Sequence, residues 1–263
     1  MGGLQSKVDI QNLRMEFTTL SDGSLLALDG INLQIETNEF LTIVGPSGCG
    51  KSTLLYLVGG FLKPSQGIIK IDGRVVVEPD PSVGIVFQRY SLFPWLSVLR
   101  NITFGLEARK MSRKERTEIA MHYLKLVHLE GFENKYPREL SGGMQQRVAI
   151  AQTLACGPEV ILMDEPFGAL DAQTRKLMQA ELFRIWEEER KTILFVTHDV
   201  EEALCLGTRV AVMTARPGRI KSVDEVSFDI SKDPDEYMSN PDFIRVKKKI
   251  WLSVKEEVKR ATS

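Results

Sequence analysis

Nine consecutive residues have the types and spacing of a loop that binds phosphate groups: Gly45-Pro46-Ser47-Gly48-Cys49-Gly50-Lys51-Ser52-Thr53. The first eight match the pattern G-x-x-x-x-G-K-[ST] without a gap. Glycines let the backbone curl so that successive N–H groups point inward, and the N-terminus of a following helix adds partial positive charge. The Lys51 ammonium would reach the β- and γ-phosphates, and the Ser52 hydroxyl would ligate Mg²⁺. These residues therefore favour the binding of a nucleoside triphosphate.

The sequence on either side predicts the elements that such a loop needs. The run 40–44 is short, apolar and partly β-branched, which is typical of a buried strand. The run 51–58 contains no helix breaker and predicts a helix. Strand, glycine-rich loop and helix together form the geometry that holds a polyphosphate. The alternative is a glycine-rich turn that binds nothing.

Two adjacent carboxylates follow another apolar run. Residues 160–163 predict a buried strand, and Asp164 and Glu165 stand at its C-terminal end. Ligands bind at that end of the strands in open α/β sheets. Side chains alternate along a strand, so the two carboxylates need not share a role. Asp164 can hold Mg²⁺ through water and Glu165 can polarise an attacking water, whereas a solvated pair of turn residues is the alternative.

Two more predicted strands end in polar side chains. Gln88 follows the apolar run 83–87, and its amide can either cap the loop or project into a site. His198 follows the apolar run 192–196, which places it at the same sheet edge as the glycine-rich loop. A histidine at this edge is a candidate for a γ-phosphate contact, with a purely structural histidine as the alternative.

Ser141-Gly142-Gly143 precedes a helical run at 148–154. Serine is a favoured N-cap, and the two glycines expose bare backbone amides at the start of the helix. The segment is either a second anion site or a simple helix cap, and the local sequence does not separate the two.

Phe17 is a candidate for stacking an adenine ring. Alternating apolar residues predict antiparallel strands at 8–17 and 26–35 with a turn at 21–24, and we expect Phe17 in a loop-like position. Ordinary core packing is the alternative role for this side chain.

Other segments complete the predicted architecture. Asp72-Gly73 lies between two apolar runs and predicts a hairpin. Helical periodicity replaces strand patterns from 91 to 157, which indicates an all-helical insertion in an α/β sheet. The run 210–213 is expected to pair across Pro217-Gly218 with the region after Arg219, and an amphipathic helix is predicted over 242–260.

The composition is that of an ordinary globular protein. The chain has 263 residues, of which 43% are hydrophobic and 26% charged, with a net charge of −1. This near-neutral charge argues against a protein that binds nucleic acid mainly through its overall positive charge. The three cysteines are far apart, so we expect neither a disulfide nor a zinc site. We find no apolar run of membrane-spanning length and no signal-peptide core.

Several separated motifs together resemble one family. GPSGCGKST (45–53), Gln88, LSGGMQQR (140–147), ILMDEP (161–166), ALD (169–171) and His198 have the order and spacing of ABC transporter ATP-binding subunits, over residues 8 to 222. Shorter phrases resemble the nitrate/sulfonate/taurine importer group, namely LFPWLSVLRNI (92–102), DEPFGALDAQTR (164–175), RPGRI (216–220) and Asn240-Pro241-Asp242-Phe243.

The resemblance implies an α/β fold of the P-loop NTPase (RecA-like) type. Its mixed sheet core carries an antiparallel β subdomain and an inserted all-helical subdomain. The whole chain would be a single ABC ATPase domain, with the core at 1–88 and 158–222 and the helical subdomain at 89–157. A C-terminal extension with the amphipathic helix would occupy 223–263.

The resemblance also implies roles for the site residues. Two subunits would form an ATP-dependent, head-to-tail homodimer, and each ATP would lie between one subunit's residues 45–53 and the other's signature motif. Glu165 would act as general base or polarise the attacking water, and His198 would contact the γ-phosphate. Gln88 would sense Mg²⁺ and the attacking water, and Asp171 would couple the two sites. The remaining implied ligands are Ser52, Gln88 and Asp164 for Mg²⁺, Phe17 for adenine, and Ser141, Gly142, Gly143 and Gln145 for ATP in trans.

The function implied is ATP hydrolysis that energises uptake of a small solute resembling nitrate, sulfonate or taurine. The partners would be integral membrane permease subunits, which dock on residues 90–99, and an extracytoplasmic substrate-binding protein. The chain would lie peripherally on the cytoplasmic face of the membrane. Met144 replaces the more frequent glutamine of the signature, which leaves the backbone amides in place. The alternatives are a soluble ABC ATPase without a transport role and a P-loop kinase of small molecules.

Overall fold

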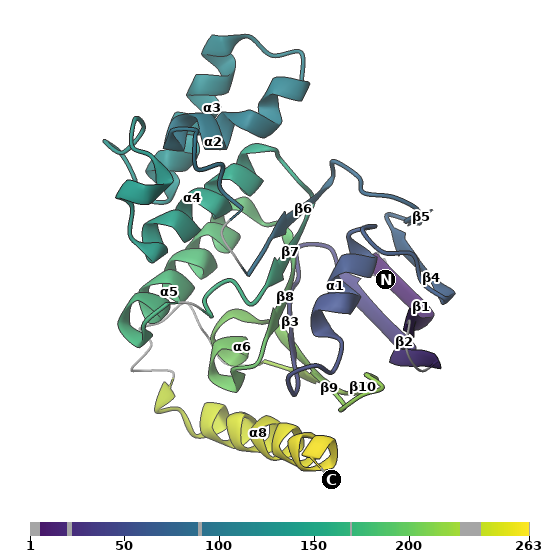
Figure 1. Cartoon of the computed structure of the whole chain (residues 1–263). Coiled ribbons are helices and arrows are strands. Elements are labelled where there is room, and N and C mark those ends of the chain that lie inside the picture. The colour runs from purple at the N-terminus through teal and green to yellow at the C-terminus, as the bar shows by residue number, and fades with distance from the viewer. Residues whose placement is uncertain (1–5, 20–22, 89–90, 169, 227–237, 263) are drawn as a thin grey trace, which may run out of the picture. The chain divides into compact units, whose positions relative to one another are not determined.

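The computed structural model describes residues 6–19, 23–88, 91–168, 170–226 and 238–262 (Figure 1). The chain divides into two compact units, one formed by residues 1–80 and 190–263 and the other by residues 81–189. The first unit contains the glycine-rich loop, and the second contains Asp164 and Glu165. The subdomain boundaries at 88, 157 and 222 stay a prediction.

The first unit is built on a mostly parallel sheet in the order β10-β9-β3-β8. The central strand β3 (Phe40–Val44) is parallel to both β8 (Thr192–Thr197) and β9 (Arg209–Met213). All five residues of β3 are buried, as expected for a parallel strand covered on both faces. The edge strand β10 (Ile220–Glu225) runs antiparallel to β9, which confirms the predicted pairing across Pro217-Gly218.

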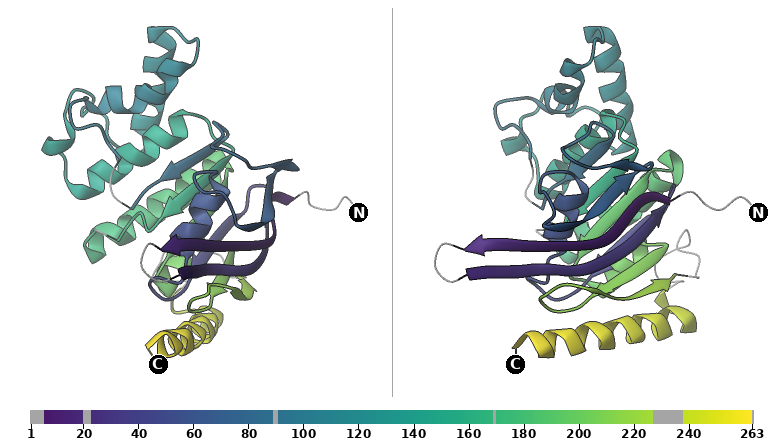
Figure 2. Two further views of the ribbon diagram at one scale, coloured as in Figure 1. Left: turned by 45° about the vertical axis from the view of Figure 1, so that its right-hand side comes forward. Right: turned by 90° about the vertical axis from the view of Figure 1, so that its right-hand side faces the viewer.

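The described residues of this unit include α1, α6 and α8. Helix α1 (Lys51–Val58) begins directly after the glycine-rich loop, as predicted. Helix α6 (Val200–Leu206) is capped by the Asp199 carboxylate, which accepts hydrogen bonds from two N–H groups of the first turn. Helix α8 (Pro241–Thr262) runs along α6 and β9 and buries Phe243 in their shared core (Figure 2).

An antiparallel sheet in the order β2-β1-β4-β5 completes the first unit. Its long pair is β1 (Ser6–Thr19) with β2 (Gly23–Glu36), and Figure 2 shows these two strands side by side. Strands β4 (Gln66–Ile71) and β5 (Arg74–Val75) form a hairpin. Asp72 and Gly73 at its turn have φ angles of 49° and 74°, the geometry that an Asp-Gly turn favours, so the predicted hairpin is confirmed.

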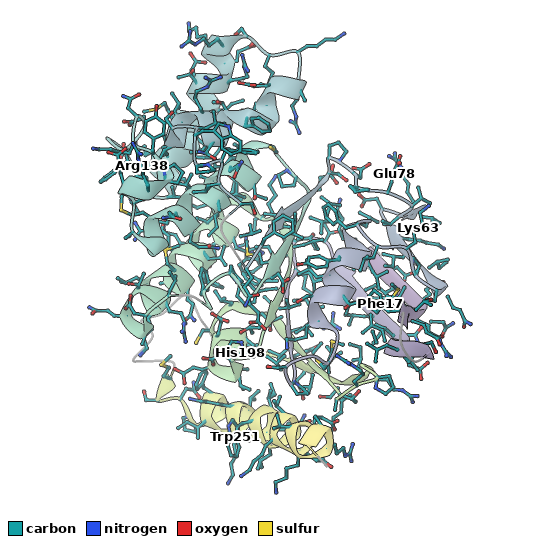
Figure 3. All side chains as sticks on the ribbon, in the orientation of Figure 1. Phe17, Lys63, Glu78, Arg138, His198 and Trp251 are labelled. Carbon is teal, nitrogen blue, oxygen red and sulfur yellow. The ribbon has the colours of Figure 1, made fainter. Side chains whose placement is uncertain are left out.

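The loop-like position predicted for Phe17 is wrong. Phe17 lies within β1 and pairs with Leu25 of β2 (Figure 3). Three register shifts between Ile10 and Glu16 interrupt the strict alternation, yet the ladder continues to the end of the strand. A bulged strand of this kind has no clean period of two, so the apolar pattern does not show that the strand continues past residue 17 to Thr19. Residues 21 and 22 of the predicted turn lie outside the described residues.

The second unit joins a parallel strand pair to a group of helices. Strand β6 (Val83–Val86) pairs with β7 (Val160–Asp164). The described residues between these two strands form helices joined by turns and contain no strand, which confirms the predicted change of character. They form α2 (Val98–Phe104), η1 (Gly105–Ala108), α3 (Arg113–Leu126), η2 (Pro137–Glu139) and α4 (Gly142–Ala155), and α5 (Ala172–Glu189) follows β7.

No helix in the described part of the chain is both long and apolar enough to span a lipid bilayer. Cys49, Cys156 and Cys205 form no disulfide bond in the structure.

Candidate functional site

The phosphate loop, residues 45–53, curls between the end of β3 and the start of α1. Gly48 and Gly50 have φ angles of 73° and 104°, in the left-handed region that glycine adopts at little cost. The Lys51 side chain folds back into the curl, where its Nζ donates to the carbonyl oxygens of Gly45 at 3.0 Å and Pro46 at 3.2 Å. Lys51 is only 5% exposed. The loop therefore holds an ammonium group inside a ring of backbone groups.

This arrangement fits a polyphosphate. The first turn of α1 carries no acidic residue, so its N–H groups and partial positive charge are not opposed by a carboxylate. A Cβ on Gly45 would lie 3.0 Å from the Cys49 Sγ and 3.1 Å from the Met213 carbonyl oxygen, so a larger residue at the start of the curl would force its neighbours to shift. A bound phosphate would replace the carbonyl oxygens as the partner of Lys51, because an anionic acceptor gives the stronger hydrogen bond.

The loop also fits Mg²⁺ that arrives with a nucleotide. Among the described residues, no group of three or more His, Cys, Asp or Glu could hold a metal ion by itself. Protein-bound Mg²⁺ keeps several waters and takes one or two protein ligands together with substrate phosphates. The Ser52 hydroxyl at the start of α1 suits that mode.

His198 lies at the same sheet edge as the phosphate loop, as predicted. Strands β8 and β3 are parallel, with Thr197 in register with Val44. The residues that follow the two strands therefore leave the sheet at the same edge. The His198 side chain is exposed there (Figure 3). The next residue, Asp199, caps α6 and fixes the direction in which the chain turns away from the edge.

In the second unit, the structure brings Gln88 and Glu165 together. Strands β6 and β7 are parallel, with Val86 in register with Met163, so the residues that follow each strand emerge at one edge. The Gln88 Nε2 donates to the Glu165 Oε2 at 3.4 Å. Asp164 still belongs to β7 and is only 3% exposed, whereas Glu165 has a φ angle of 42°, which turns the chain out of the strand. The two carboxylates thus occupy different environments, as the alternation argument predicts.

Ser141 caps α4 as predicted, and its hydroxyl accepts a hydrogen bond from the Met144 N–H at 3.3 Å. The Gln145 side chain is engaged within its own chain, where its Nε2 donates to the carbonyl oxygens of Pro137 at 3.0 Å and Leu140 at 3.2 Å. Those contacts hold the start of the helix against the preceding turn. The roles of Ser141 and Gln145 in trans stay predictions.

Asp171 organises the start of α5. Its Oδ1 accepts hydrogen bonds from the N–H groups of Gln173 at 3.1 Å and Thr174 at 3.0 Å. The hydrogen bonds from Thr174 hold the pKa of the Asp171 carboxyl below its usual range. A Cβ on Gly143 would lie 2.8 Å from the Thr174 Cγ2, so Asp171 and the start of α4 are linked through one threonine. The sequence did not lead us to predict this contact of Thr174. Its only signal there was that Thr174 lies within the motif DEPFGALDAQTR (164–175).

Sequence reasoning also missed Arg216. Its guanidinium donates to the carbonyl oxygen of Gly48 in the phosphate loop. The phrase RPGRI contributed only to the family resemblance, and no local pattern connects residue 216 with residue 48.

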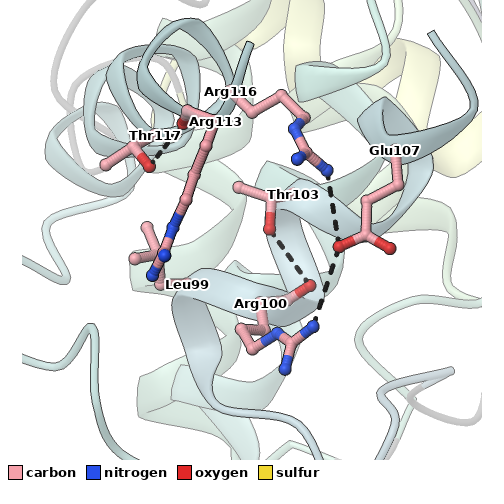
Figure 4. Close-up of a pocket in the computed structure, with 7 residues that line it drawn as sticks. All are labelled: Leu99, Arg100, Thr103, Glu107, Arg113, Arg116 and Thr117. Carbon is pink, nitrogen blue, oxygen red and sulfur yellow. Dashed lines mark hydrogen bonds and ion pairs between the residues drawn. The ribbon is translucent and has the colours of Figure 1, made fainter. Parts of the chain in front are cut away.

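A cavity of about 360 Å³ lies beside α2 and the start of α3 (Figure 4). In it, Glu107 forms ion pairs with Arg100 at 3.8 Å and Arg116 at 3.5 Å. No residue predicted to bind ATP or Mg²⁺ lines this cavity. The lining residues are Leu99, Arg100, Thr103, Glu107, Arg113, Arg116 and Thr117.

The family model described as ABC transporter matches residues 28–168, a stretch that includes the phosphate loop, the Ser141 helix and the acidic pair. The chain belongs to the ABC transporter family. It is an ATP-binding subunit with ATPase activity, and its α/β fold is that of the P-loop NTPases, as the motifs predicted.

Similar proteins support the subgroup as well. The nitrate import ATP-binding protein NrtD of Synechocystis is 54% identical over 199 residues, which are 76% of this chain and 75% of that protein. The taurine import ATP-binding protein TauB of Jannaschia is 45% identical over 244 residues, 92% of this chain and 91% of that protein. This ABC ATPase therefore resembles the nitrate/sulfonate/taurine group.

A solved structure agrees with the fold. The ATP-binding cassette MJ0796, in a dimeric post-hydrolysis state bound to ADP and Pi, has a TM-score of 0.73 and 35% identity to this chain. The match covers 84% of this chain and all of that chain.

Proposed function

We propose that this ABC ATPase is the ATP-hydrolysing subunit of an importer for a small solute of the nitrate, sulfonate or taurine kind. The observation that carries the proposal is its identity of 45–54% to proteins named for nitrate and taurine import. It would work through separate integral membrane permease subunits and receive solute from an extracytoplasmic binding protein. Its place would be peripheral, on the cytoplasmic face of the cell membrane.

The proposed chemistry is the transfer of the ATP γ-phosphoryl group to water. The phosphate loop binds the triphosphate through backbone N–H groups and Lys51, and Mg²⁺ held by Ser52, Asp164 and Gln88 neutralises developing charge. Glu165 accepts a proton from the attacking water or polarises it. His198 donates a hydrogen bond to the γ-phosphate.

We further propose that Ser141, Gly142, Gly143 and Gln145 contact ATP bound by a second copy of the chain, with Asp171 coupling the two sites. The backbone amides at the start of α4 suit a γ-phosphate, since a helix N-terminus favours anions. The dimeric cassette among the similar structures supports this arrangement.

Ser141→Arg is expected to block the dimer without weakening ATP binding to the monomer. The larger cation would obstruct the second copy's nucleotide while leaving this chain's own phosphate loop unchanged. In a Glu165→Gln background, a fluorescent ATP analogue measures affinity and light scattering measures mass. Ser112→Arg is the matched control, because Ser112 caps α3 in the same way. Loss of monomer ATP affinity in Ser141→Arg would contradict a role in trans.

The proposed docking stretch for the membrane subunits includes an exposed aromatic cluster. Residue 90 lies outside the described residues, but Trp95 is 71% exposed. Phe93 packs against Trp95, with ring centroids 5.7 Å apart, and against Phe104 at 4.3 Å. Aromatic residues are enriched in interfaces, and clustered exposed apolar groups mark them.

The importer is tested with the complete assembly in proteoliposomes. We expect the solute-loaded binding protein to stimulate ATP hydrolysis, and nitrate, an alkyl sulfonate or taurine to accumulate. Trp95→Ala should lower recovery of the ATPase with the permease subunits without changing its own ATPase rate. Trp251→Ala on α8 is the control, since Trp251 is also exposed, at 49%. An active ATPase that no permease subunit retains would favour the alternative, a soluble ABC ATPase.

A further inference from the structure

The connection between β9 and β10, residues 214–219, packs directly against the phosphate loop. The Arg216 Nε and one terminal nitrogen donate to the Gly48 carbonyl oxygen at 3.2 and 2.9 Å. Two residues later, a Cβ on Gly218 would lie 2.2 Å from the carbonyl oxygen of Cys49. Two successive carbonyl groups of the phosphate loop therefore rest on this connection, and one of them accepts two hydrogen bonds from it.

The Arg216 contact determines how one peptide plane of the phosphate loop is turned. The peptide unit is planar and trans, so its C=O and N–H point in opposite directions. Arg216 holds the Gly48 carbonyl on one side, while the N–H of Cys49 points to the other side and donates to the Pro46 carbonyl oxygen at 3.3 Å. If the Gly48 carbonyl rotated inward, it would present a partial negative charge to a bound phosphate. The guanidinium opposes that rotation.

The connection is itself braced by side-chain and backbone contacts. The Thr214 hydroxyl donates to the Pro217 carbonyl oxygen at 3.0 Å and accepts from the Arg219 N–H at 2.9 Å. The Gly218 N–H donates to the Ala27 carbonyl oxygen at 2.8 Å, and the Gly218 carbonyl accepts from the Asp29 N–H at 3.0 Å. The connection is thereby fixed both internally and to β2.

Helix α8 supplies a further anchor through Glu257. Its Oε2 accepts a hydrogen bond from the Ala215 N–H at 3.1 Å, next to Arg216 in the chain. Its Oε1 accepts from the Lys221 ammonium at 2.7 Å and the Arg260 guanidinium at 3.0 Å. The Glu257 side chain is buried, with the whole residue 1% exposed. A buried carboxylate is tolerated when it is paired and hydrogen-bonded in this way.

The charge state of Glu257 is consistent with this anchoring. Burial by itself raises the pKa of the Glu257 carboxyl, but the hydrogen bonds from Lys221 and from the Ala215 N–H outweigh it and bring the pKa below its usual range. The ionised form, which accepts all three hydrogen bonds, is therefore the one present near neutral pH.

We infer that Arg216 is a positioning residue of the ATP site and that α8, through Glu257, holds it against the phosphate loop. The inference rests on the proposed role of residues 45–53 in ATP binding. It assigns the C-terminal helix an effect on nucleotide affinity, because displacement of Glu257 from Ala215 removes one anchor of the segment that carries Arg216.

The first test is Arg216→Ala, measured by titration with a fluorescent ATP analogue and by steady-state ATPase assays. We expect the Kd and the KM for ATP to rise only roughly fivefold, because Arg216 is exposed and acts on the phosphate through the loop backbone, with kcat within about twofold of wild type. Arg216→Lys keeps a positive charge and a hydrogen-bond donor group, and should recover most of the affinity. Arg219→Ala is the matched control, since Arg219 pairs with Asp29 and makes no contact with Gly48.

Glu257→Gln tests the contribution of α8. We expect the KM for ATP to rise, but less than in Arg216→Ala. The double variant should have the same KM as Arg216→Ala alone, because Glu257 acts through Arg216. Thermal unfolding shows whether each variant is folded at the assay temperature. Wild-type Kd and KM in a folded Arg216→Ala variant would overturn the inference, as would equal losses in Arg219→Ala. Wild-type protein that fails to bind ATP would instead overturn the proposed function.

Discussion

Glu165→Gln is expected to lower kcat for ATP hydrolysis by about 10²–10⁴-fold, the usual contribution of a general base. Glutamine has nearly the same shape and can still accept the hydrogen bond from the Gln88 Nε2. It cannot take a proton from water, so binding is expected to survive while the chemical step fails. Phosphate release measures the rate.

The same variant should form a stable dimer with ATP, because the γ-phosphate that both copies contact is no longer removed. Size-exclusion chromatography with light scattering detects the dimer with ATP and its absence with ADP. Glu188→Gln on α5, an exposed carboxylate of the same unit, is the control and should leave both rate and mass unchanged. Hydrolysis at the wild-type rate in Glu165→Gln would exclude this residue as the base.

Lys51→Ala is expected to weaken ATP binding by roughly a hundredfold, since the loss of charge-assisted hydrogen bonds to phosphate costs about 3 kcal/mol. The Lys51 ammonium is already enclosed by the phosphate loop, where it bonds to the carbonyl oxygens of Gly45 and Pro46. A phosphate entering the loop therefore meets a cation that already lies inside it and only exchanges its hydrogen-bond partners. Equilibrium titration with a fluorescent ATP analogue gives the affinity.

Lys63→Ala is the matched control for Lys51→Ala, because Lys63 is an exposed lysine of the same unit. Thermal unfolding separates a binding defect from a loosened loop, since Lys51 also bridges two carbonyls of the free loop. If a folded Lys51→Ala variant bound ATP as tightly as wild type, residues 45–53 would not be the triphosphate site.

The features that the sequence determined by itself are local. The strand 40–44, the loop with its two left-handed glycines and the helix from residue 51 lie within one short stretch, so their geometry follows from residue types a few positions apart. The Asp72-Gly73 hairpin and the Ser141 cap were predictable for the same reason. The position of His198 at the sheet edge was predictable from the rule that parallel strands end at the same edge.

What only the tertiary structure decided depends on strand order and register between distant segments. Gln88 meets Glu165 because β6 and β7 pair in parallel, 77 residues apart in the chain at the contact itself. Phe17 lies in the β1 ladder and not in a loop because it pairs with Leu25 of β2 after several register shifts, and the apolar pattern does not reveal that pairing. Arg216 reaches Gly48 across 168 residues, and Glu257 becomes buried although it is a charged residue of an amphipathic helix. When two side chains lie far apart in the sequence, packing and strand register decide whether they meet. The residue types around each of them do not reveal it.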